Sequence, residues 1–229
     1  GLGGMGLGKG DRLVTMLQNR LDAATLHWAC QITGIVITPL NWRATAAELD
    51  SVLADAGARA VAFEAATAPT VAGANSARGI PRLAIGDAAG DRHVDDFRRL
   101  DPLTALPEIA PDDPSLMLYT SGTTGRAKGV PRGHGAERAA ALAHVAQNLY
   151  RFGECTLGVM PLYHTMGVRL LLAMAAINGC FVCLPRFDAG AALALIARER
   201  VTALYLVPTL YHDLLADPGS PASATSSVT

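Results

Sequence analysis

Short apolar runs of strand length alternate along the chain with longer stretches in which apolar residues recur every three or four positions. The short runs predict buried strands, and the longer stretches predict helices with one buried face. We expect strands at residues 12–17, 35–38, 60–63, 83–85, 115–119, 157–160, 180–184 and 203–207. We expect helices at residues 22–34, 45–57, 135–150, 166–178, 189–200 and 209–216.

The helix expected at residues 45–57 has recognisable signals at both ends. Thr45 and Glu48 have the spacing of a capping box, in which each side chain bonds the backbone N–H of the other residue. Gly57 follows the last apolar position and fits the left-handed residue that often ends a helix. We therefore predict that this helix begins after Thr45 and stops at Gly57.

The repeated alternation of strands and helices predicts an α/β fold with largely parallel sheets and helices on both faces. Residues 78–114 interrupt the pattern with several prolines and aspartates, so we expect a surface connection there. We predict a first subdomain at residues 1–110, a second at residues 111–217 and a tail at residues 218–229.

The composition is that of an ordinary globular protein. The 229 residues are 50% apolar and 17% charged, with a formal net charge of −1. This near-neutral charge argues against a nucleic-acid partner, which would require a dense basic face. The most apolar stretch, residues 170–177, is much shorter than the roughly 20 residues of a membrane span, so we expect a buried helix.

The four cysteines and six histidines show no pattern that requires a metal or a redox function. Cys180 and Cys183 lie in an expected strand, where residues three apart point to opposite faces. We interpret the cysteines as small buried residues in a reducing, cytoplasmic environment. His27 and His144 fall within predicted helices and are expected to be packing or surface residues, and we expect no metal ligands in this chain.

The segment after the strand at residues 115–119 has the residue types of a phosphate-binding loop. Its candidate ligands are Thr120, Ser121, Gly122, Thr123, Thr124, Gly125 and Lys128. Glycines allow backbone N–H groups to turn inward around an anion, hydroxyls add donors, and a lysine supplies a positive charge. The spacing differs from the phosphate loop that ends in Gly-Lys-Ser/Thr, because Ala127 precedes Lys128. A turn without a ligand is the alternative.

From Tyr119 to Val130 the chain resembles the signature loop of the adenylate-forming, or AMP-binding, superfamily. That superfamily contains acyl- and aryl-CoA ligases, luciferases and the adenylation domains of peptide synthetases. The usual proline before the lysine is Ala127 here. Three further segments resemble family motifs in the same order, namely Pro-Leu-Asn-x-Arg at residues 39–43, Pro-Leu-Tyr-His-Thr-Met-Gly at residues 161–167, and Val-Pro-Thr at residues 207–209.

The resemblance implies part of the N-terminal domain of the acyl-CoA synthetase/luciferase-like fold. It also implies an AMP-forming carboxylate–CoA ligase, with a small-molecule carboxylate, ATP and CoA as substrates. In such an enzyme the loop from Thr120 to Lys128 would hold the β- and γ-phosphates of ATP. His164 would border the carboxylate and the acyl tunnel as the candidate catalytic residue. A histidine that only caps the next helix is the alternative.

The sequence lacks the segments with which this family contacts adenine, ribose and magnesium, and it lacks the small C-terminal domain with the adenylation lysine. We therefore expect most magnesium ligands to lie outside this chain and the chain alone to be inactive. Two other interpretations stay open. The chain could act as a non-catalytic nucleotide- or pyrophosphate-binding module, or it could be part of a peptide-synthetase adenylation domain.

Overall fold

The computed structural model describes residues 1–97, 99–101, 105–120 and 127–217. The chain forms two compact units, and each is described by itself below. The first unit comprises Gly1–Leu17 and Asp22–Ala136, and the second comprises Gln18–Leu21 and Glu137–Thr229. The change of unit falls at residue 136 rather than near residue 110, because the strand that follows residue 113 pairs with the sheet of the first unit.

The first unit is built on one mixed sheet, which among the described residues has seven strands in the order β5-β4-β3-β1-β2-β6-β7. The strands are β1 (Arg12–Met16), β2 (Val36–Pro39), β3 (Ala60–Glu64), β4 (Arg82–Ile85), β5 (Arg92–His93), β6 (Pro114–Thr120) and β7 (Lys128–Gly133). Neighbouring strands are parallel except for the antiparallel pair β6–β7. The prediction of a largely parallel sheet is therefore confirmed.

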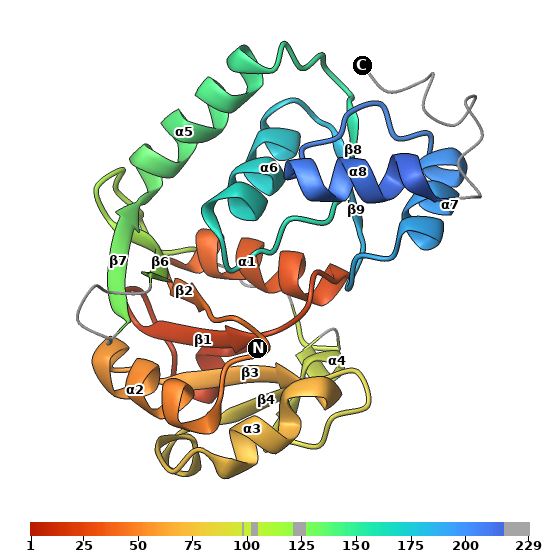
Figure 1. The fold of residues 1–229 in the computed structure, drawn as a ribbon. Coiled ribbons are helices and arrows are strands. Elements are labelled where there is room, and N and C mark those ends of the chain that lie inside the picture. The colour runs from red at the N-terminus through yellow and green to blue at the C-terminus, as the bar shows by residue number, and fades with distance from the viewer. Residues whose placement is uncertain (98, 102–104, 121–126, 218–229) are drawn as a thin grey trace. The chain divides into compact units, whose positions relative to one another are not determined.

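Helices cover both faces of this sheet, with α1 on one side and α2 and α3 on the other (Figure 1). The helices of the first unit are η1 (Leu2–Met5), α1 (Leu21–Thr33), α2 (Ala46–Ala56), η2 (Ala65–Thr67), α3 (Ala68–Gly73), η3 (Ser76–Gly79) and α4 (Val94–Phe97). Alternate strand residues such as Val14, Met16 and Val61 form one buried cluster with Leu49 and Val52 of α2. This alternation is what a strand with two covered faces produces.

The helix α2 has the ends that its sequence predicts. The Thr45 hydroxyl accepts a hydrogen bond from the Glu48 backbone N–H, and the Glu48 carboxylate accepts one from the Thr45 backbone N–H. Gly57 follows the helix in the left-handed conformation, with φ 56°. The capping-box prediction and the glycine stop are both confirmed.

The second unit contains a two-stranded parallel sheet with helices on both faces. Its elements are α5 (His134–Gln147), which starts in the first unit, β8 (Cys155–Gly158), α6 (Thr165–Ala176), β9 (Cys180–Cys183), α7 (Ala189–Glu199) and α8 (Pro208–Ala216). Leu157 of β8 packs with Leu193 and Ile196 of α7 in one cluster. Phe181 of β9 packs instead with Leu170 of α6 in another cluster, so the two faces of the sheet are covered by different helices.

Two segments differ from the predicted secondary structure. Residues 128–133 form the strand β7, which was not expected, because they pair along their length with β6. Residues 203–207 were expected to form a strand, but only Ala203 forms a bridge, to Thr156. The Thr156 hydroxyl donates a hydrogen bond to the Ala203 carbonyl at 3.0 Å. In a longer strand this carbonyl would accept from the backbone N–H of the neighbouring strand instead.

The cysteines are less uniformly buried than expected. Cys30 and Cys155 are buried, but Cys180 is exposed and Cys183 is partly exposed. The reason is that β9 is an edge strand of its sheet among the described residues. His27 and His144 are buried in their helices, so of the two roles left open by the sequence, packing and surface exposure, both residues take the packing role. Within the described part of the chain, no helix is long and apolar enough to cross a membrane.

Candidate functional site

The ends of the predicted phosphate loop are held together by the hairpin of β6 and β7. Thr120 is the last residue of β6 and lies opposite Lys128, the first residue of β7. Both residues are exposed. The pairing places the backbones of these two motif residues opposite each other at the same end of the β6–β7 hairpin.

The central residues of the motif lie outside the part of the chain that the structure describes. These residues are Ser121, Gly122, Thr123, Thr124 and Gly125. Their contacts with phosphate therefore stay a prediction from the sequence. The structure does describe the paired residues on either side of them, namely Tyr119 and Thr120 of β6 and Lys128 and Gly129 of β7, which we call the stem.

Two other residues of the motif have packing roles at this stem. The Tyr119 hydroxyl donates a hydrogen bond of 2.6 Å to the Asp55 carboxylate. Burial of the ring, together with this neighbouring carboxylate, raises the pKa of Tyr119. Gly129 lies opposite Tyr119, and a Cβ atom at Gly129 would lie 2.9 Å from the Met117 sulfur and 3.0 Å from the Tyr119 hydroxyl. A glycine at this position therefore gives the tyrosine room to reach Asp55.

The stem lies at the edge of the sheet where ligands bind in α/β folds. Strands β1, β2, β3 and β6 are parallel, so their carboxyl ends share one edge with Thr120. The chain passes from β1 to β2 on one side and then crosses to β3 on the other side of β1. The carboxyl edge near such a reversal is the usual ligand position in open α/β sheets, and β6 lies two strands from the reversal at β1 on that same edge.

His164, the other predicted site residue, lies in the second unit at the start of α6. It occupies the N-cap position, but its side chain makes no capping hydrogen bond. The side chain is exposed, and the Tyr163 ring lies 4.7 Å from it between centroids. His164 therefore occupies the capping position with its backbone, but its side chain does not cap the helix. The imidazole is available to a ligand.

Two residues, Gly167 and Asn19, shape the segment before α6, and the family motif alone does not explain their roles. A Cβ atom at Gly167 would lie 2.2 Å from the Pro161 carbonyl oxygen and 2.4 Å from that of Met160, so only glycine lets the helix approach this backbone. The buried side chain of Asn19 makes hydrogen bonds to the same segment. A polar residue after a strand is typical of an ordinary loop. No neighbouring residue therefore indicates from the sequence that Asn19 has a special role.

The motif residues Asn41 and Arg43 have local contacts at the end of β2. The Asn41 side-chain oxygen accepts a hydrogen bond of 3.0 Å from the Arg43 backbone N–H. The Arg43 guanidinium lies 4.1 Å from the centre of a Trp42 ring. These contacts shape the turn that follows β2.

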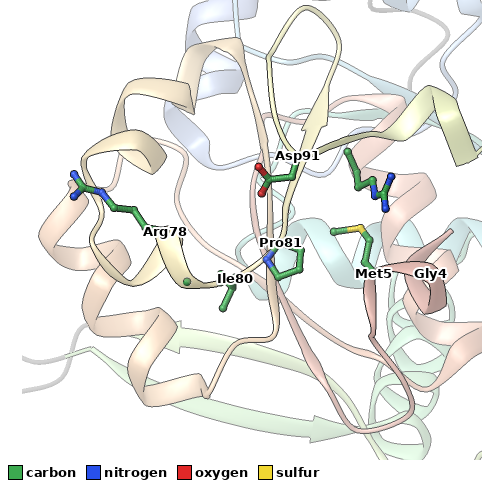
Figure 2. Close-up of a pocket in the computed structure, with 8 residues that line it drawn as sticks. Gly4, Met5, Arg78, Ile80, Pro81 and Asp91 are labelled. Atoms are coloured by element: carbon green, nitrogen blue, oxygen red, sulfur yellow. The ribbon is translucent and has the colours of Figure 1, made fainter.

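A surface cavity of 620 Å³ lies elsewhere in the first unit (Figure 2). It is lined by Gly4, Met5, Arg78, Gly79, Ile80, Pro81, Asp91 and Arg92. Pro81 directly precedes β4, so the cavity opens at the amino end of that strand. Asp91 is paired with Arg82 at 2.9 Å, and Arg78 extends away from Met5 and Pro81 (Figure 2). None of the lining residues belongs to the predicted site, and we assign the cavity no role in it.

The described residues do not offer a site for a protein-held metal ion. No group of three or more His, Cys, Asp or Glu side chains in this part of the chain is placed to hold one. Magnesium commonly binds through substrate phosphates and only one or two carboxylates. We therefore derive no step through a metal held by these residues.

Comparison with known proteins gives concordant matches over the whole chain. The family model described as AMP-binding enzyme matches residues 1–229. A feruloyl-CoA synthase from an Amycolatopsis species is 34% identical over 221 residues, which are 95% of this chain and 43% of that enzyme. This chain thus spans less than half the length of that relative.

Solved structures match the fold as well as the sequence. The ATP-bound structure of MatB from Rhodopseudomonas palustris has a TM-score of 0.85 and 29% identity, and the match covers 99% of this chain and 45% of that one. An inhibitor-bound N-terminal domain of FACL13 from Mycobacterium tuberculosis has a TM-score of 0.86 and 26% identity, with 96% of this chain and 55% of that one covered. The fold is therefore a large part of such an N-terminal domain.

Proposed function

The chain belongs to the AMP-binding enzyme family, and from this premise we propose that it is part of an ATP-dependent, AMP-forming carboxylate–CoA ligase. In the first step the carboxylate oxygen attacks the α-phosphorus of ATP, forms acyl-AMP and displaces pyrophosphate. In the second step the thiol of CoA attacks the acyl carbon, loses its proton, and displaces AMP. Aromatic and fatty acids are the substrate classes that the names of the relatives suggest.

The observation that carries this proposal is the pairing of Thr120 with Lys128 across the β6–β7 hairpin. Negative charge builds up on the departing pyrophosphate during the first step, so fixed donors and cations at that position lower the barrier. The hydroxyl of Thr120 and the ammonium group of Lys128 start and end the loop that would surround the β- and γ-phosphates. The residues from Ser121 to Gly125 would supply further hydroxyl and backbone N–H donors.

His164 would act on the other substrate. Its imidazole is exposed and free of any capping bond, which suits a group that contacts a carboxylate. An exposed imidazole beside the Tyr163 ring can donate to one carboxylate oxygen and leave the other free to attack. Replacement of His164 by alanine should therefore raise the KM for the carboxylate or slow adenylation.

Binding of MgATP and of pyrophosphate by the gene product that carries this chain tests the proposal. Lys128→Ala should weaken pyrophosphate binding by about 1.5–3 kcal/mol, or roughly 10- to 100-fold in Kd, because a charged contact is lost. Arg59→Ala is the matched control, since it also removes one exposed positive charge. Arg59 directly precedes β3, so it lies at the amino ends of the parallel strands, whereas Thr120 lies at their carboxyl ends. Equal Kd values for wild type and Lys128→Ala would refute the role of the loop. Tight binding without any turnover would favour the non-catalytic binding module.

A further inference from the structure

The side chain of Asn19 is buried, with 5% of its surface exposed. It lies in the segment Gln18–Leu21, which follows β1 in the sequence but belongs to the second unit. Its Nδ2 group donates to the carbonyl oxygen of Gly158 at 3.0 Å and to that of Met160 at 2.8 Å. Its Oδ1 atom accepts a hydrogen bond from the backbone N–H of Leu162 at 3.0 Å.

These three bonds fix the orientation of the amide. With Nδ2 and Oδ1 exchanged, an acceptor would face two carbonyl oxygens and a donor would face an N–H group. Both hydrogens of the NH₂ group and one lone pair of the oxygen are used in the observed orientation. The bonds connect residues 19 and 158–162, which are about 140 positions apart in the sequence, as the separations of 139, 141 and 143 residues show.

The bonded backbone lies where the chain leaves the small sheet of the second unit. Gly158 is the last residue of β8 paired with β9, and its partner there is Cys183. Beyond this point the backbone no longer has a strand beside it to accept and donate hydrogen bonds. Asn19 bonds every second residue at 158, 160 and 162, as a neighbouring strand would. The Gly158 carbonyl also accepts from the Leu184 backbone N–H at 3.4 Å, so the Met160 carbonyl and the Leu162 N–H are the buried groups that Asn19 satisfies. Such groups are costly to leave unpaired.

The same backbone leads directly to His164. The His164 N–H donates to the Pro161 carbonyl at 3.0 Å, and the His164 carbonyl accepts from Val168 in the first turn of α6 at 3.2 Å. Gly167 brings this turn against the carbonyl groups of Met160 and Pro161. Residues 160–164 are thus held by the Asn19 amide and by the start of α6.

We propose that Asn19 is a positioning residue, which fixes the backbone of residues 160–164 and so places the His164 imidazole for the carboxylate substrate. This inference rests on the proposed function, because it takes the carboxylate as the ligand of His164. Without the Asn19 amide, residues 160–164 would still be held by the first turn of α6, but they would lose the hydrogen bonds that fix the backbone between β8 and α6. Small displacements of a contacting group reduce catalysis strongly, by up to about 100-fold for 1 Å.

A double-mutant cycle in the gene product that carries this chain tests the proposal. Asn19→Ala should lower kcat/KM for the carboxylate roughly 10- to 100-fold, with little change in the KM for ATP. In the His164→Ala background the same substitution should lower kcat/KM less than about 3-fold, since the group that it places is gone. Asn75→Ala is the control, because Asn75 is exposed and its side chain does not cap η3. Full additivity of Asn19→Ala and His164→Ala would overturn the proposal.

A second measurement separates failure of this inference from failure of the proposed function. Hydrogen exchange of the Leu162 amide needs no substrate, and Asn19→Ala should accelerate it while leaving α7 amides unchanged. Unchanged protection of the Leu162 amide would refute the positioning role of Asn19 even in an active enzyme. If the wild type is inactive but the Leu162 amide loses protection in Asn19→Ala, the proposed function is refuted and the hold of Asn19 on this backbone is supported.

Asn19→Asp covers the case in which the alanine variant does not fold. The carboxylate keeps the oxygen that accepts from Leu162, but it has no NH₂ group for Gly158 and Met160. Above neutral pH we expect a loss of kcat/KM at least as large as that of the alanine variant, because a carboxylate oxygen would face the Gly158 and Met160 carbonyl oxygens. The activity should recover as the pH falls, because the protonated acid can donate to one carbonyl. Wild-type activity of Asn19→Asp above neutral pH would contradict the proposed placement.

Discussion

The buried histidine His27 should make the stability of the first unit depend on pH. It lies in α1 with 3% of its surface exposed, and its Nε2 atom has no hydrogen-bond partner among the described residues. The ring meets Trp28 edge-on at 5.6 Å between centroids. Burial, with a smaller contribution from His134, lowers the pKa of His27 from 6.5 to about 4.

The sign of the effect follows from the direction of this shift. Above pH 6.5 the imidazole is neutral in both the folded and the unfolded chain, so His27 carries no penalty. Between pH 6.5 and about 4 the unfolded chain binds a proton that the folded chain does not, and the free energy of unfolding falls. The loss contributed by His27 should reach about 3 kcal/mol at pH 4.

Urea unfolding followed by tryptophan fluorescence measures this contribution. Both tryptophans of the chain, Trp28 and Trp42, lie in the first unit, so their fluorescence reports its unfolding. The stability difference between wild type and His27→Leu should shift by about 3 kcal/mol in favour of the variant from pH 7.5 to pH 4. A difference for His27→Leu that stays constant with pH would refute the reasoning.

Two further substitutions test the packing of motif residues. Gly167→Ala should lower the stability of the second unit by about 1–3 kcal/mol, because the new methyl group would overlap the Pro161 carbonyl oxygen, 2.2 Å away; an unchanged thermal unfolding curve by circular dichroism would contradict this. Tyr119→Phe should destabilise the first unit by about 0.5–1.5 kcal/mol, because its solvent-exposed hydrogen bond to the Asp55 carboxylate is lost. In wild type, ultraviolet titration should show Tyr119 still protonated at pH 10, since its pKa is raised, and ionisation at that pH would count against this contact.

Elements with local signals could be predicted from the sequence. The helix α2 has its capping box at Thr45 and Glu48 and its left-handed glycine at position 57, and all three features are present in the structure. Capping depends on residues a few positions apart, so a single sequence contains the necessary information. The motif from Tyr119 to Gly129 identified the family for the same reason.

Elements that depend on distant partners could not be predicted. The strand β7 contains Pro131 and two glycines, which disfavour a strand, yet it forms because β6 lies beside it. It lies at the edge of the sheet, where a proline is tolerated since one side needs no donor. Asn19 is the corresponding case in the candidate site, because its three partners lie about 140 residues away.

The identity of the nucleotide product tests the central claim most directly. The gene product that carries this chain would be incubated with MgATP, CoA and a panel of aromatic and fatty carboxylic acids, and the nucleotides would be separated by chromatography. We predict that AMP and pyrophosphate form in equal amounts, and only when a carboxylic acid is present. Formation of ADP and phosphate, or AMP release that is independent of the carboxylic acid, would contradict the assignment.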